Sequence, residues 1–420
     1  TPLLLDLDDH VISANDEFVR VNTFTKAATL NFAKGKHSIS RKEMRDEDVT
    51  ELLDFVKASL EEGSRIQIKS IAIESYASPE GEVDLNNNLA EDRAKSAQSF
   101  LVGKAKRMKF DAAKDDGFYS LSPKGEDWAG FKNEVNKTTH EDKELILRVL
   151  EMTADLTKRE QEIRNMAKTY KFLEKEVLPQ LRRAQVVVSY DQVGYSDDEL
   201  KSLAMSNPDT LNVEEILKAA SLEENINDKL RVYKESQRIF ANDWRTSNNV
   251  GYVLYMMGDV AGATEAFDKA ASIGDNATVS NNVGAVTHRN EGKATDRVNE
   301  LLSASNTAES KYNMGLIQVE EGKYEEAITS MGETKSFNVA LAQLLAGHND
   351  DASQTLDANE DNPALNYYLK AIIGARTNNS EMVMDNLKSA FDKDASLKDK
   401  AKTDREFIKF FENADFLAIF

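Results

Sequence analysis

The side chains best placed to bind a ligand are concentrated in the stretch Ile71–Leu101. It passes from an alternating run of β-branched residues, through a turn containing Pro79 and Gly81, into a helical pattern. We therefore expect a strand, a loop and a helix. Because a loop between two rigid elements can hold side chains in fixed positions, a small ligand could be held there.

Residues that could carry catalysis show no arrangement that would support it. The 5 histidines are far apart in the sequence, and none has a metal-binding spacing. The absence of cysteine excludes disulfides, thiolate catalysis and sulfur metal sites. No nucleophile elbow, phosphate loop or dinucleotide fingerprint is present. We therefore predict no enzyme, no cofactor and no metal site, with a cell-wall enzyme as the least favoured alternative.

Composition bounds the class of protein. A chain of 420 residues predicts two or three domains. Its formal net charge of -20 argues against a nucleic-acid binder, which needs a basic face. No window approaches the roughly 18 apolar residues of a membrane helix, so we predict no transmembrane segment. The chain starts at Thr1 without a methionine, which indicates a processed or cut start, and a lipid-anchoring cysteine could have preceded it.

The first half of the chain predicts alternating strands and helices. Apolar positions at Val49, Leu52 and Val56 have helical spacing, and Asn88 with Glu91 resembles a capping box. The expected strands are 27–32, 65–75, 118–121 and 182–190, and the expected helices are 46–60, one opening near Asn88, 142–152 and 158–178. This order predicts a mixed α/β layer with helices on one face of a sheet.

These residues resemble the OmpA-like domain, a periplasmic module that holds outer membranes to peptidoglycan. The run Asn86–Ala94 is similar to the family's Asn, Leu, Arg, Ala pattern, and Arg182 with Arg183 matches its closing strand. Tyr76–Gly81, reading Tyr-Ala-Ser-Pro-Glu-Gly, looks most like the Bacteroidota branch. The resemblance implies an α+β fold, with a small sheet and helices on one face.

The resemblance also implies a binding site for the diamino acid of a peptidoglycan stem peptide. In the family an aspartate and an arginine hold the ammonium and the carboxylate of that residue. Arg93 matches the arginine, whereas the aspartate position is occupied by Ser78. Glu80 could supply the missing charge. With Asn86 from the matching pattern, the resemblance implies Ser78, Glu80, Asn86 and Arg93 as the candidate ligand-binding residues. The alternative is that Arg93 pairs with a neighbouring acid such as Asp84 or Glu91, and that the loop is only a turn.

Glycine and alanine spacings in the second half repeat at helical offsets. Gly251, Gly258, Ala263 and Phe267 have the same spacing as Gly315, Gly322, Ala327 and Met331. This resembles the tetratricopeptide repeat (TPR), a pair of helices of about 34 residues. The expected domains are an unassigned segment at 1–24, the OmpA-like domain at 25–195 with an insertion near 110–155, a linker at 196–211, and an all-α TPR superhelix (α-solenoid) at 212–420 with a C-terminal capping helix.

Stacked helix pairs of this kind form a groove that can bind a protein segment. The groove-facing positions in the repeat register hold Asn248, Tyr252, Tyr255, Asn281, His288 and Tyr312. Asparagine and tyrosine suit an extended peptide, through hydrogen bonds to its backbone. The alternative is that the asparagines tolerate the turns and the tyrosines are half-buried.

Two binding modules without visible chemistry predict a non-catalytic scaffold or adaptor. We expect a periplasmic protein associated with the outer membrane, in which the OmpA-like domain gives the placement and the TPR array binds envelope proteins. A subunit of an outer-membrane assembly or transport complex is one form of this hypothesis. The alternative function is a peptidoglycan-binding anchor that uses Arg93.

Overall fold

The computed structural model describes residues 4–361 and 363–420, and they form two units. Residues up to Phe18 belong with Ser196–Phe420, whereas Val19–Tyr195 form the second unit. The second unit is therefore inserted in the sequence of the first. Its ends meet, because Val21 and Val193 are paired and the amide of Gly194 donates to the carbonyl of Arg20 at 2.6 Å. The segment that the sequence left unassigned thus belongs partly to the repeat unit.

The inserted unit contains one four-stranded sheet in the order β1-β4-β2-β3. Its strands are β1 Val21–Asn31, β2 Ile66–Ala77, β3 Tyr119–Glu126 and β4 Arg183–Val193. β4 is antiparallel to both β1 and β2, and β3 is parallel to β2. The four expected strands are present, and each is longer than the sequence suggested.

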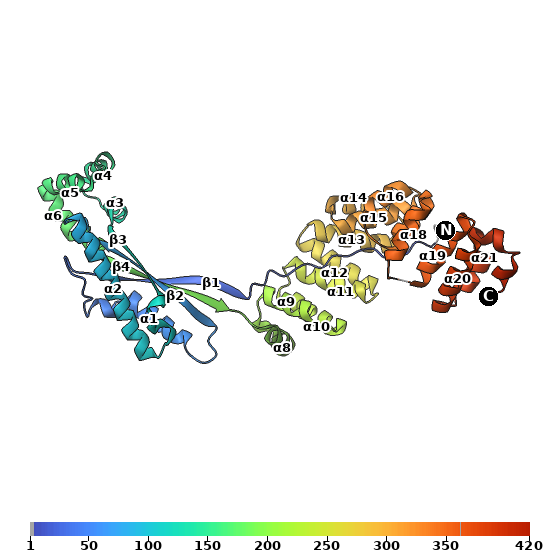
Figure 1. Ribbon diagram of the computed structural model, residues 1–420, viewed down its shortest axis with the longest axis horizontal. Coiled ribbons are helices and arrows are strands. Elements are labelled where there is room, and N and C mark those ends of the chain that lie inside the picture. The colour runs from blue at the N-terminus through green and yellow to red at the C-terminus, as the bar shows by residue number, and fades with distance from the viewer. Residues whose placement is uncertain (1–3, 362) are drawn as a thin grey trace. The chain divides into compact units, whose positions relative to one another are not determined.

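Two helices, α1 (Glu47–Ser59) and α2 (Val83–Met108), pack with the sheet around one apolar core (Figure 1). Leu52 of α1 and Ala94 and Ala97 of α2 share this core with strand residues such as Ile73. Residues of one parity along a strand face the same side, which explains why the alternating isoleucines meet the helices together. The expected small sheet with helices on one face is present.

The predicted start of α2 near Asn88 is wrong. The helix begins at Val83, and Glu82 occupies the cap position without a side-chain hydrogen bond. Asn86 and Asn88 therefore lie inside the helix. The chain leaves its extended path at the Pro79 turn and becomes helical directly after Gly81 and Glu82, without needing an asparagine cap.

A group of short helices between β3 and β4 has an apolar core of its own. Its helices are α3 Trp128–Lys137, α4 Lys143–Met152, α5 Leu156–Asn165, α6 Ala167–Glu176 and α7 Leu178–Leu181. Phe131, Ile146 and Leu173 are buried in this core. The insertion expected near 110–155 thus extends to residue 181. The single helix expected at 158–178 is divided at Met166, whose backbone is not helical.

The repeat unit consists of consecutive helices that pack on their neighbours in the sequence. The helices are α8 Asp197–Ser206, α9 Val213–Leu222, α10 Ile226–Ile239, α11 Trp244–Met256, α12 Val260–Ile273, α13 Ala277–Glu291, α14 Asp296–Ser305, α15 Ala308–Glu320, α16 Tyr324–Met331, α17 Phe337–Ala346, α18 Asn349–Ala358, α19 Pro363–Arg376, α20 Ser380–Lys393, α21 Leu397–Thr403 and α22 Ala414–Leu417. The glycine offsets reflect close packing: a Cβ at Gly251 would lie 2.7 Å from the ring of Phe267. The helices form a TPR-type array.

The two ends of this array differ from the linker and the single capping helix that the sequence predicted. Residues 196–211, expected as a linker, contain α8, whose Ser196 and Glu199 form a capping box and whose Leu200 is buried against the unit. At the other end Phe407, Phe410 and Phe416 are buried together in a 3-10 turn and a short helix. These phenylalanines cover the last helix pair, as expected of a cap.

Candidate functional site: a groove occupied by the N-terminal segment

An extended segment of the chain itself, residues 4–14, lies along the repeat unit. We call it the N-terminal segment. Four asparagines from α11, α13, α15 and α17 each bind both the backbone N–H and the backbone C=O of one of its residues. The pairs are Asn249 with Ala14, Asn282 with Ile12, Asn313 with His10, and Asn338 with Asp6, at distances of 2.6 to 3.0 Å. We call these four residues the asparagine ladder.

The bound residues have one parity, which is the pattern of an extended chain. In an extended chain the N–H and C=O of residue i point to one side, and those of residue i+1 point to the other. Successive repeats contact residues ever closer to the N-terminus, from Ala14 at α11 to Asp6 at α17. The segment therefore runs antiparallel to the order of the repeats. A carboxamide carries a donor and an acceptor side by side, so it can pair with the N–H and the C=O of one residue at the same time.

A second layer of asparagines supports the ladder. Asn248 donates to the carbonyl of Ile12 at 3.0 Å, and Asn281 donates to the carbonyl of His10 at 2.9 Å. Asn282 in turn donates to Asn248 at 2.8 Å, and Asn313 donates to Asn281 at 3.0 Å. All of these side chains are buried. A connected network of this kind fixes which way each amide faces, so the ladder is preorganised for a backbone.

The side chain of Asp8 has its own binding site. Its carboxylate accepts hydrogen bonds from the Tyr312 hydroxyl at 2.9 Å and from the Asn338 amide at 2.7 Å. Burial raises the pKa of Asp8 to about 7, with repulsion from Asp6 adding to the shift and the bond from Tyr312 opposing it. The two donors therefore hold a carboxyl group that gives up its proton near neutral pH.

Asp9 and His288 form a buried pair beside this position. The Asp9 carboxylate lies 2.7 Å from Nδ1 of His288, and both side chains are fully buried. The other ring nitrogen of His288 lies 3.3 Å from Glu320. Burial alone would lower the pKa of His288, but the bonds to Asp9 and Glu320 outweigh it and raise the pKa. The ring thus links the segment to α15.

Ring stacking and apolar contacts complete the binding of the segment. The rings of His10 and Tyr312 are 3.8 Å apart and nearly parallel, at 4°. Leu4 is buried in the apolar core of the C-terminal helix pairs, and Val11 packs on the core around Phe267. Burial lowers the pKa of His10, although Glu309 opposes that shift. The segment is thus held by side-chain contacts as well as along its backbone.

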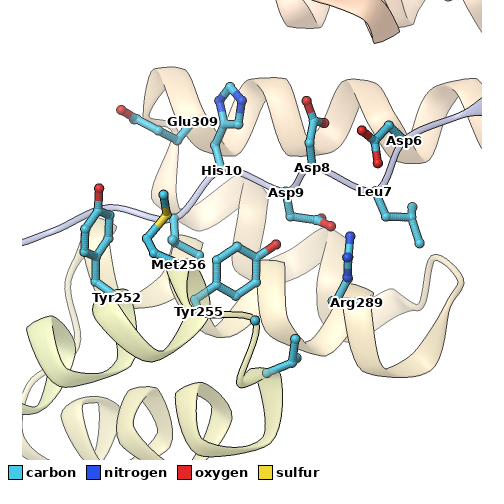
Figure 2. Close-up of a pocket in the computed structure, with 13 residues that line it drawn as sticks. Asp6, Leu7, Asp8, Asp9, His10, Tyr252, Tyr255, Met256, Arg289 and Glu309 are labelled. Carbon is cyan, nitrogen blue, oxygen red and sulfur yellow. The ribbon is translucent and has the colours of Figure 1, made fainter. Parts of the chain in front are cut away.

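A cavity of about 640 Å³ remains beside the segment (Figure 2). Its lining includes Tyr252, Tyr255 and Met256 of α11, Arg289 of α13, and residues 6–11 of the segment. Figure 2 shows Tyr255 below the segment, with Glu309 on the opposite side of the chain. The cavity belongs to the same groove.

The structure places all six residues predicted for the groove at this segment. Asn248, Asn281, His288 and Tyr312 contact the segment, and Tyr252 and Tyr255 line the cavity next to it. The sequence analysis missed the four ladder asparagines and the segment itself. The repeated Ser-Asn-Asn at 247–249 and 280–282 could have indicated the ladder. The tripeptide does not recur at Asn313 and Asn338, where the spacing between successive ladder residues becomes shorter.

The predicted loop site in the inserted unit is a closed cluster. Arg93 is 0% exposed, and its guanidinium donates to the carbonyls of Tyr76 at 2.7 Å, Lys36 at 3.0 Å and Ala33 at 3.4 Å. Burial, and secondarily the charge of Arg182, lower the pKa of Arg93 to about 10, so it stays charged at neutral pH. Its bonding partners are carbonyls rather than Asp84 or Glu91, so the pairing alternative is wrong.

Glu80 is held by a residue that the sequence analysis did not assign to the site. Arg182 donates to the Glu80 carboxylate at 2.8 Å, Lys34 lies 3.2 Å from it, and the Ser78 hydroxyl donates to it as well. Burial would raise the pKa of Glu80, but the bonds from Ser78 and Arg182 lower it. The carboxylate thus already has its countercharge.

Asn86 faces a different partner from the other three loop-site residues. Its amide donates to Glu126 at 2.8 Å, and the Trp128 indole donates to the second oxygen of Glu126 at 2.9 Å. Ser78, Glu80 and Arg93 are therefore brought together around Arg182, and Asn86 is not. Binding of a stem peptide at this loop stays a prediction.

Among residues 4–361 and 363–420, no group of three or more His, Asp or Glu side chains is placed to hold a metal ion. Within the same ranges, no helix has both the length and the apolar character needed to cross a bilayer.

Comparisons with known proteins found distant structural similarity. No family model and no curated protein matches the chain. The crystal structure of the APC/C hetero-tetramer Cut9-Hcn1 aligns with 79% of the chain and 66% of its own, at 10% identity and a TM-score of 0.41. The crystal structure of YrrB, described as a TPR protein with an unusual peptide-binding site, aligns with 49% of the chain and 99% of its own, at 18% identity and a TM-score of 0.26. The TPR-type assignment therefore rests on the helix pairs and glycine contacts of this chain.

Proposed function

We propose that the protein is a non-catalytic scaffold whose repeat groove binds an extended protein segment by its backbone. The observation that carries the proposal is the asparagine ladder, in which four side chains each bind the N–H and the C=O of one residue. Backbone bonds give affinity without regard to side chains, which is how extended peptides are commonly held. The N-terminal segment is the built-in occupant of this site.

The position of the ladder in the groove is compatible with an occupant that can be exchanged. A buried carboxamide that loses its partners leaves unpaired polar groups, at a cost of about 1–3 kcal/mol each. An empty groove would expose Asn249, Asn282, Asn313 and Asn338 to water, so they can be satisfied there too. A row of amides on successive helices is therefore compatible with both an empty and an occupied groove, as an exchangeable site requires.

The inserted unit supports the proposed placement of the scaffold. Its sheet, its helices on one face and its Tyr76–Gly81 loop are consistent with the resemblance to OmpA-like domains. We propose on that basis a periplasmic protein associated with the outer membrane, whose groove partners are envelope proteins of an assembly or transport complex. A peptidoglycan anchor is less favoured, because the Arg93 guanidinium is buried and bonded to carbonyls.

The test uses the full chain with its groove emptied. His10→Pro with Ile12→Pro removes two backbone donors of the N-terminal segment, because proline has no N–H. A fluorescent peptide with the sequence of residues 4–16 should then bind this variant saturably. Adding Asn282→Leu and Asn313→Leu should abolish that binding, whereas Asn227→Leu, an exposed position on α10, should not. Absence of peptide binding to the emptied chain would contradict the proposed function.

A further inference from the structure

We propose that the groove selects segments that carry a carboxyl or carboxamide side chain, then an acid, then a planar ring, the pattern of Asp8, Asp9 and His10. A partner protein would bind through an extended stretch of this chemistry. The inference rests on the proposed function and names the class of partner for the same site. It follows from dividing the contacts of the segment into those that depend on sequence and those that do not.

The ladder itself cannot distinguish one sequence from another. Its bonds to Asp6, His10, Ile12 and Ala14 all go to backbone N–H and C=O groups, which every residue except proline provides. Selection must therefore come from side-chain contacts. Polar side chains of the segment are held at two adjacent positions, and a ring is stacked at the third.

The site for the first acid consists of donors. The Tyr312 hydroxyl and the Asn338 amide both point their hydrogens at the Asp8 carboxylate. A carboxyl or carboxamide oxygen can accept both bonds, whereas an aliphatic side chain would leave two donors without their partner. The site for the ring follows from the same tyrosine, because residues two apart in an extended chain face the same side. The ring face of Tyr312 stacks on position 10 while its hydroxyl binds position 8.

The site for the second acid is the more selective of the two. His288 is fully buried between the Asp9 carboxylate and Glu320. When the Asp9 and Glu320 carboxylates are ionised they only accept hydrogen bonds, so a ring between them donates from both nitrogens and needs an acceptor at position 9 for its Nδ1 hydrogen. An aliphatic side chain would leave that hydrogen unpaired inside the protein, and a lysine or arginine would place a cation beside it. Position 9 therefore favours aspartate.

The N-terminal segment acts as an intramolecular competitor for such partners. A tethered ligand has a high effective concentration, of the order of millimolar for short flexible tethers. A partner segment that lacks this pattern would not displace it. A partner that has the pattern, with further contacts outside the groove, would.

The experiment measures a panel of peptides against the emptied full chain, His10→Pro with Ile12→Pro. The panel contains the sequence of residues 4–16, the same peptide with Asp8→Leu or Asp9→Leu, one with both, and a matched control with Asp16→Leu. Faster amide exchange at Asp6 and Ala14 in the variant first verifies that the groove is open. We expect each substitution at position 8 or 9 to weaken binding at least about 30-fold, as for truncation of buried charged pairs elsewhere. The control should bind like the parent peptide.

Equal binding of all peptides would overturn the selection while leaving the proposed function intact, and absence of any binding would overturn both. A second measurement does not depend on emptying the groove. In the otherwise unmodified chain, Asp9→Leu, His288→Leu and the double variant form a cycle read by amide exchange at Ile12. We expect the two single variants to be as fast as the double, because each breaks the same pair. Additive effects would contradict a specific contact between Asp9 and His288.

Discussion

At the scale of single residues, buried charge determines what the molecule can do at its two clusters. Asp8 and Arg93 are both removed from water, but they differ in what compensates the burial. Arg93 has three carbonyls that accept from its charged form. Asp8 has two donors and two acidic neighbours, Asp6 and Asp9, so its charged form is held less well. The first should therefore stabilise the fold, and the second should respond to pH.

Asp8→Asn should strengthen binding of the N-terminal segment at pH 8. The pKa of Asp8 is raised from 3.8 to about 7. The bound state therefore takes up a proton more readily, and its stability falls as pH rises from about 4 to about 7. His288, with a raised pKa, acts in the same direction, and His10, with a lowered pKa, acts in the opposite one.

The measurement is thermal unfolding of the repeat unit at pH 5 and pH 8. The variant should gain on the order of 2 kcal/mol more at pH 8 than at pH 5. Asp6→Asn, which alters an exposed neighbour, should change the pH dependence less. A variant that keeps the pH dependence of the parent chain would rule out Asp8 as its source.

Arg93→Gln should destabilise the inserted unit by about 3 kcal/mol, because hydrogen bonds to buried carbonyls are lost. The stability of Arg93→Lys should lie between that of the parent chain and that of Arg93→Gln, because an ammonium keeps the charge but cannot reproduce the fork of a guanidinium. Arg107→Gln, an exposed position on the same helix, serves as the control in urea unfolding. Retention of stability by Arg93→Gln, together with lost binding to isolated sacculi, would support the peptidoglycan alternative instead.

At the scale of elements, the sequence predicted those strands and helices whose hydrophobic periodicity lies within a single element. The strands at 21–31, 66–77 and 183–193 and the helix at 47–59 were predictable, because alternation and helical spacing act within one element. The start of α2 was not, because Asn88 with Glu91 looks like a cap inside a helix that was already formed. Asn282 and Asn313 were missed because their partners, Ile12 and His10, lie about 270 to 300 residues away in the sequence.

Helix contacts in the array should be sensitive to a single methyl group. A Cβ at Gly251 would lie 2.7 Å from the ring of Phe267, which is fully buried and has no room to move. Gly251→Ala should therefore cost about 1–3 kcal/mol through overpacking. Gly103→Ala, in the interior of α2 with open space around it, should instead stabilise the chain by up to about 1 kcal/mol. Calorimetry would measure the melting temperature of both variants. A shift in the same direction for Gly251→Ala and Gly103→Ala would contradict this packing.

At the scale of the whole molecule, the repeat unit is discontinuous in sequence. The sequence analysis expected domains in linear order, because nothing local in residues 4–18 indicates a partner near the other end of the chain. The two ends of the inserted unit meet at Val21 and Val193, as is common where one domain is inserted in another.

Replacement of residues 21–193 by a short glycine-serine linker should leave the repeat unit folded. The linker has only to join Arg20 to Gly194, whose backbones are hydrogen-bonded at 2.6 Å. We expect the helical circular dichroism of the shortened chain to melt at the temperature of the repeat unit in the full chain. Loss of cooperative melting would show that the two units depend on each other for stability.

The most direct measurement of the asparagine ladder is residue-resolved amide exchange of the N-terminal segment in the intact chain. The amides of Asp6, His10, Ile12 and Ala14 donate to the ladder and should exchange slowly. Those of Leu7, Asp8, Val11 and Ser13, which have no such bond in the described part of the chain, should exchange quickly. This alternation is the expected result. Uniformly fast exchange from Asp6 to Ala14 would contradict a groove that holds an extended backbone.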